Sequence, residues 1–123
     1  MTALQQFLNR LASQPACLVE VESTQGSVPR EKGAWMAVFA QGGNLGATEN
    51  ATDSATVGTI GGGHLEWMAI QQALRLLAQP QPGELRERYA LGPSLGQCCG
   101  GVVRLRFRRV AAGDIGSLRQ ALS

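Results

Sequence analysis

The chain has 123 residues, of which 44% are apolar and 16% are charged, and its formal net charge is +2 at pH 7. This length suits a single domain with one hydrophobic core, residues 1–123, and excludes two well-packed halves. No apolar run approaches the roughly 18 residues of a membrane helix, and the mild charge does not favour nucleic-acid binding. The first residues lack a secretion signal, so we expect a cytoplasmic protein whose three cysteines stay reduced.

Three segments of the first half follow regular hydrophobic patterns. Apolar residues at helical spacing in 3–12, after Thr2, predict a capped amphipathic helix. Residues 17–21 alternate as a half-buried strand does, and residues 33–40 are apolar on both faces, which predicts a central strand. Residues 41–55, rich in Gly, Asn, Thr and Ala, are predicted to form a connecting loop without chemistry.

The second half begins with the order strand, glycine turn, helix. Residues 56–60 predict a short strand, Gly61–Gly63 predict a tight turn, and the helix predicted over 64–79 ends before Pro80. The apolar face expected for this helix consists of Trp67, Ile70, Leu74 and Leu77.

Two further strands, over 84–90 and 102–110, and a short helix over 114–122 complete the pattern. These elements favour an α+β fold, with a mixed β-sheet of about five strands and about three helices packed on it. Only one strand-helix-strand unit is convincing, so a doubly wound fold is not expected.

The last strand carries a run of arginines that alternates with apolar residues. Arg104, Arg106 and Arg108 share one side, which we assign to solvent and not to a nucleic-acid patch. We expect Glu20 and Glu22 to face them across the sheet.

Two adjacent cysteines, Cys98 and Cys99, lie between Gln97 and two glycines. Glycines leave a thiol without side-chain cover, so this pair points to sulfur or soft-metal chemistry. Adjacent cysteines with a single distant histidine do not supply the four ligands of a structural zinc site. Cys17, in an alternating strand, is expected to serve packing.

Two other segments offer groups for a ligand. Gly61–Gly63 place backbone N–H groups at the start of a helix, which suits a phosphate, although a turn used only for packing is the alternative. Glu66 is either a favourable first-turn charge or an acceptor for a heterocycle. Ser27 and Arg30, near a proline turn, either hold an anion or form a solvated hairpin loop.

Three segments, taken in chain order, resemble the XdhC/CoxI family of xanthine dehydrogenase accessory proteins, and the resemblance spans nearly the whole chain. They are Gly26-Ser27-Val28-Pro29-Arg30 with Gly33-Ala34, Gly58-Thr59-Ile60-Gly61-Gly62-Gly63 with Leu65-Glu66, and Gly92-Pro93-Ser94-Leu95-Gly96-Gln97-Cys98-Cys99-Gly100-Gly101.

This resemblance implies a maturation chaperone and not an enzyme. Such a protein binds the molybdenum cofactor (molybdopterin), protects it while a cysteine desulfurase replaces an oxo ligand by sulfur, and hands it to an apo xanthine dehydrogenase-type molybdoenzyme. In this interpretation Cys98 or Cys99 ligates molybdenum, the glycine turn holds the phosphate and Glu66 contacts the pterin edge. The implied cofactor-binding set is Ser27, Arg30, Gly61, Gly62, Gly63, Glu66, Gln97, Cys98 and Cys99.

Family members usually carry a second, Rossmann-like domain, and we expect it to be absent from this chain, which has no second α/β pattern. A homodimer is also considered. Two other hypotheses stay open on the residues alone. One is a thiol-dependent sulfurtransferase or redox enzyme that uses Cys98 and Cys99 directly, and the other is an interaction module whose glycine loops serve packing.

Overall fold

The computed structural model describes residues 2–26, 32–40, 55–79, 83–90 and 101–122. In chain order its elements are α1 (Ala3–Leu11), β1 (Ala16–Gln25), β2 (Trp35–Phe39), β3 (Ala55–Gly58), α2 (Gly63–Ala78), β4 (Glu84–Ala90), β5 (Val102–Val110), a 3-10 helix (Ala112–Asp114) and α3 (Ile115–Leu122). All helices and strands predicted from the sequence are present, with ends shifted by a few residues. The loop predicted over 41–55 falls almost entirely outside the described residues.

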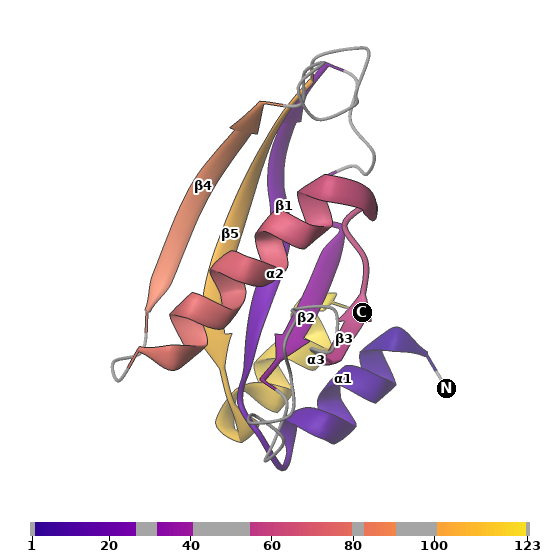
Figure 1. The fold of residues 1–123 in the computed structure, drawn as a ribbon. Coiled ribbons are helices and arrows are strands. Elements are labelled where there is room, and N and C mark those ends of the chain that lie inside the picture. Colours follow the sequence, from indigo (N-terminus) through magenta and orange to yellow (C-terminus); the bar gives the residue numbers. More distant parts are fainter. Residues whose placement is uncertain (1, 27–31, 41–54, 80–82, 91–100, 123) are drawn as a thin grey trace.

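The strands form one sheet in the order β3-β2-β1-β5-β4. The α+β class is confirmed, with five strands and three α-helices among the described residues. All four strand pairings are antiparallel, however, where the sequence suggested a mixed sheet. The reason is that the unit β3-α2-β4 joins the two opposite edges of the sheet and not neighbouring strands, with α2 crossing one face obliquely (Figure 1).

The face under α2 forms one continuous apolar core. The helix contributes Leu65, Ala69, Ala73 and Leu76, and the sheet contributes Cys17, Val19, Val21, Met36, Val38, Val103, Leu105 and Phe107. The predicted apolar face of α2 was therefore wrong at Trp67, a residue that is 49% exposed. Two alanines at the centre of the contact let the helix lie close to the strands, while Ile70, Leu74 and Leu77 pack at the margin of the core.

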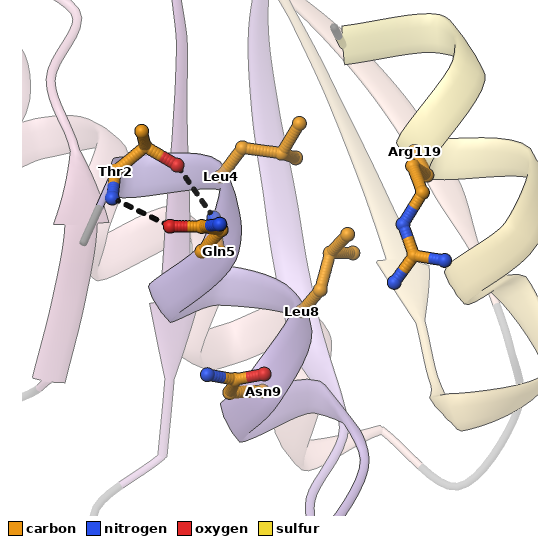
Figure 2. A pocket seen from close by; sticks show the side chains of 6 residues that line it. All are labelled: Thr2, Leu4, Gln5, Leu8, Asn9 and Arg119. Carbon is orange, nitrogen blue, oxygen red and sulfur yellow. Dashed lines mark hydrogen bonds between the residues drawn. The ribbon is translucent and has the colours of Figure 1, made fainter.

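The other face is covered only in part, by α1 and α3. Phe7 of α1 packs against Trp35 and Phe39, with ring centroids 5.3 and 6.1 Å apart. Leu118 of α3 is buried in the same cluster. The predicted cap of α1 is confirmed as a capping box, in which Gln5 N donates to Thr2 Oγ1 and Thr2 N donates to Gln5 Oε1, each at 3.1 Å (Figure 2).

Beyond these two helices the second face carries charged side chains. Arg106 Nη1 and Arg108 Nε lie 3.9 and 3.6 Å from Glu20 Oε1, and Arg86 Nε donates to Glu22 Oε2 at 2.8 Å. The predicted arrangement, with acidic side chains of β1 facing the arginines of β5, is therefore confirmed for Glu20.

Candidate functional site

The segments that carry the first and third motifs leave the sheet at the same end, where Gln25 and Ala90 both lie level with Val102. Because every pairing is antiparallel, β3 runs in the same direction as β1 and β4 (Figure 1), but it ends earlier, with Gly58 level with Val19 of β1. Gly26 follows β1, and Gly101 precedes β5 directly beside it, since a Cβ on Gly26 would lie 3.3 Å from Gly101 Cα. The described residues that flank 27–31 and 91–100 thus meet at Gly26 and Gly101, while β2, which follows 27–31, lies beside Gly58 at the glycine turn.

The glycine turn between β3 and α2 needs its glycines. Gly58, at the end of β3, has φ +82°, and a Cβ there would lie 2.7 Å from the backbone oxygen of Trp35. Gly61, Gly62 and Gly63 have φ of 124°, 75° and 66°, values that other residues rarely adopt. The predicted tight turn is confirmed, and its backbone conformation explains why glycine recurs there.

The carboxylate of Glu66 holds this turn together. Its Oε2 accepts hydrogen bonds from Thr59 Oγ1 at 2.6 Å, Ile60 N at 3.1 Å and Gly62 N at 3.0 Å. Gly62 caps α2 but has no side chain, so Glu66 reaches back from the first turn to satisfy the cap N–H. The Glu66 carboxylate therefore stabilises the turn by accepting hydrogen bonds from it.

This arrangement bears on the predicted phosphate cradle. Gly62 N–H donates to Glu66, and Gly61 N–H donates to Thr59 Oγ1 at 3.0 Å, so two of the three glycine donors already have acceptors. A ligand anion at this turn would meet mainly the N–H groups of Gly63, His64 and Leu65, which have no acceptor within the helix.

An aromatic pair next to the turn was not predicted from the sequence. His64 and Trp67 stack with ring centroids 5.6 Å apart and planes 17° from parallel, and both side chains are exposed. Trp67 is the one large hydrophobic residue that is exposed among the described residues. Its position three residues after His64 was the available signal, but at helical spacing with Ile70 and Leu74 it suggested a core residue instead.

The cysteine pair and its neighbour Gln97 lie outside the described residues, as do Ser27 and Arg30, so their predicted roles stay predictions. Cys17 is confirmed as a packing residue, since its side chain is fully buried. Burial raises the pKa of the Cys17 thiol to about 12, although a hydrogen bond with the backbone of Arg108 opposes the shift. This thiol is inert at neutral pH.

A hollow between α1 and α3 is lined by Thr2, Leu4, Gln5, Leu8, Asn9 and Arg119 (Figure 2), and none of them is a predicted site residue. Within the described ranges, no group of three or more His, Cys, Asp and Glu side chains is placed to hold a metal ion. None of the described helices is long and apolar enough to cross a membrane.

A comparison with protein-family models matches residues 10–90 to the XdhC and CoxI family. The chain belongs to this family. The resemblance to this family is thereby confirmed, and the matched residues include the first two of the three motifs. A search of curated proteins finds no match.

Among solved structures, the chain is similar to a protein from Bacillus halodurans described as a xanthine dehydrogenase. The two share 22% sequence identity and superpose with a TM-score of 0.69 over 98% of this chain. At this identity the similarity supports the fold alone. The match covers 34% of that protein, so this chain spans about a third of its length.

Proposed function

We propose that this chain binds the molybdenum cofactor, holds it while a cysteine desulfurase supplies sulfur, and delivers it to an apo xanthine dehydrogenase-type molybdoenzyme. In this role the chain is a chaperone and not the sulfurating enzyme. The bound cofactor would supply a soft metal centre suited to a thiolate ligand. The chain would bind, orient and shield it.

One observation carries the proposal beyond family membership: the residues that flank the Ser27–Arg30 segment border both other motifs. Gly26, before it, lies beside Gly101, which follows the cysteine pair, and Trp35 and Met36, after it, lie beside Gly58 at the glycine turn. This topology supports a ligand that contacts segments far apart in the sequence.

The described residues fit two parts of such a ligand. The first turn of α2 offers backbone donors and a positive helix end to a phosphate. The stacked, exposed rings of His64 and Trp67 offer a flat apolar surface beside them to a fused heterocycle. Glu66 would contribute mainly by holding the turn in shape, because its Oε2 already accepts three hydrogen bonds.

The test is anaerobic incubation of the full chain with molybdenum cofactor, followed by gel filtration and fluorescence detection of the oxidised pterin. We expect pterin to elute with the protein. Cys98→Ala or Cys99→Ala should reduce retention by on the order of tenfold, if the lost ligand contributes about 1.4 kcal/mol. Cys17→Ala is the matched control, since it removes a thiol that is buried in the core.

Retention equal to the parent chain in the Cys98→Ala/Cys99→Ala double variant would remove the thiols from the proposal. The thiol-enzyme hypothesis has a different outcome. If the chain alone turns over a sulfur donor and mass spectrometry detects a persulfide on Cys98 or Cys99, a sulfurtransferase replaces the chaperone.

A further inference from the structure

The face of the sheet opposite α2 is left uncovered beyond α1 and α3. Its charged side chains there lie in rows across β1, β5 and β4. From the covered half outward, strand register gives the rows Leu18–Arg108–Glu84, Glu20–Arg106–Arg86 and Ser23–Arg104–Arg88. Glu22 is the extra residue of the β-bulge between the last two rows, because the register shifts between Val21 and Ser23. The last row lies nearest the end of the sheet where β1 and β4 stop, close to Gly26 and Gly101.

The first two rows and Glu22 form a balanced network of three arginines and three glutamates. Each of these arginines has a carboxylate oxygen within 3.9 Å. Arg106 also donates to Glu84. No charge in this part of the face is left without a counter-charge.

The last row is different. Arg88 and Arg104 are direct cross-strand partners, both are exposed, and within the described residues neither has a carboxylate at ion-pair distance. Like charges in directly opposite positions destabilise a sheet. Their third neighbour in the row, Ser23, carries a hydroxyl and no charge.

We infer that the row Ser23–Arg104–Arg88 is a binding site for a phosphate monoester. Cross-strand partners have Cβ atoms about 5 Å apart, so two guanidinium groups on one face can reach the same group. A phosphate monoester has three acceptor oxygens and close to two negative charges at neutral pH, which match two forked cations. The Ser23 hydroxyl can donate a further hydrogen bond.

This site lies on the face of the sheet opposite α2, because Val103 and Leu105, on either side of Arg104, point into the core under α2. It is therefore separate from the glycine turn. It requires neither molybdenum nor the cysteines, so it stands or falls independently of the proposed chaperone function.

The experiment titrates the full chain with phenyl phosphate and follows the arginine side-chain Nε–H resonances by NMR. We expect saturable shifts confined to Arg88 and Arg104, weakening below about pH 6 as the ester becomes a monoanion. Arg88→Gln and Arg104→Gln should each weaken binding at least fivefold. Arg119→Gln, which removes the same charge from exposed α3, should leave the affinity unchanged.

Two further comparisons test the chemistry. Arg88→Lys keeps the charge but loses the fork, and we expect it to bind more weakly than the parent chain. Malonate, a dianion with its charges on separate carboxylates, should also bind more weakly than phenyl phosphate. Equal binding of malonate, equal weakening by Arg119→Gln, or no saturable shift would overturn the assignment.

A thermal readout uses two neighbours on one strand. In phosphate-free buffer, Arg88→Gln should raise the melting temperature because it removes a repulsion, whereas Arg86→Gln should lower it because Glu22 loses its partner. Phenyl phosphate should then raise the melting temperature of the parent chain and of Arg86→Gln, but not of Arg88→Gln. A lower melting temperature for Arg88→Gln would show that Arg88 and Arg104 do not repel each other, and the proposed site depends on that repulsion.

Discussion

The face of the sheet under α2 is apolar along most of the length of its central strands, whereas the opposite face is apolar under α1 and α3 and charged beyond them. The alternation of the strands does not explain the difference, because the same side of β1 carries Leu18 and then Glu20, and the same side of β5 carries Arg106, Arg108 and then Val110. Helix length does. At 1.5 Å per residue the 16 residues of α2 reach about 24 Å, while the 9 and 8 residues of α1 and α3 reach about 12 to 14 Å.

The charged side chains mark the area of the sheet that no helix of the described chain covers. Where α1 and α3 end, Glu20 replaces apolar residues such as Leu18 on the same side of β1. One side of β1 therefore belongs first to the apolar core and then to the ion-pair network. The effect of a substitution on the free energy of unfolding should differ between the two parts.

The sharpest test of this comparison uses two adjacent residues of β5 that point to opposite faces. Phe107 is fully buried under α2, so Phe107→Ala should lower the free energy of unfolding by about 3 to 5 kcal/mol. Arg106→Ala removes a half-exposed ion-paired side chain and should cost about 1 kcal/mol or less. Urea denaturation measures both, and similar losses would show that the two faces do not differ in this way.

A second test uses pH, because Cys17 lies on the α2 face with its pKa raised to about 12 by burial. The folded state favours the neutral thiol, so this stabilisation is complete below the unfolded pKa near 9 and is lost as pH rises toward 12. Above pH 9 the loss should approach about 1.4 kcal/mol per pH unit.

Cys17→Ala provides the control for this test. The variant has no thiol to ionise, so its free energy of unfolding should fall less steeply than that of the parent chain between about pH 9 and pH 11. Parallel slopes in alkaline urea titrations would mean that the thiol is more accessible than its complete burial indicates.

Much of the fold was predictable because its elements follow simple periods. Alternation in β5 identified both its buried side and its arginine side, and Thr2 identified the start of α1. Strand directions were not predictable, because periodicity within a segment carries no information on which strand lies beside it. The antiparallel sheet depends on the choice of partners, such as β1 between β2 and β5.

At the candidate site, residue types were easier to predict than their partners. The glycine turn was expected, but its main acceptor, Glu66, bonds to the turn itself, a contact that requires the three-dimensional path of the chain. Trp67 was assigned to the core because its spacing is helical, and only the close approach of Ala69 and Ala73 to the sheet places its ring in solvent.

A smaller effect is expected within the charged half. Glu20 is flanked by Arg106 and Arg108, and its Oε1 is buried without a hydrogen-bond partner. Glu20→Gln removes the shared counter-charge and should lower the free energy of unfolding by up to about 1 kcal/mol at low salt. The loss should shrink in high salt, which screens the repulsion between the two arginines. A loss independent of salt would assign Glu20 a packing role.

The smallest effect should come from Glu84, an exposed residue at the margin of the network. The hydrogen bond from Arg106 lowers the pKa of its carboxyl, with the charges of Arg106, Arg86 and Arg108 acting in the same direction. Because the folded pKa is the lower one, the stabilisation is present above the unfolded pKa and is lost as pH falls through the folded value. Glu84→Gln should therefore reduce the fall of the melting temperature as pH is lowered. Glu87→Gln, on the α2 side of the same strand, should reduce that fall less. If the two variants gave the same acid profile, the ion pair between Glu84 and Arg106 would contribute nothing measurable to the stability of the folded state.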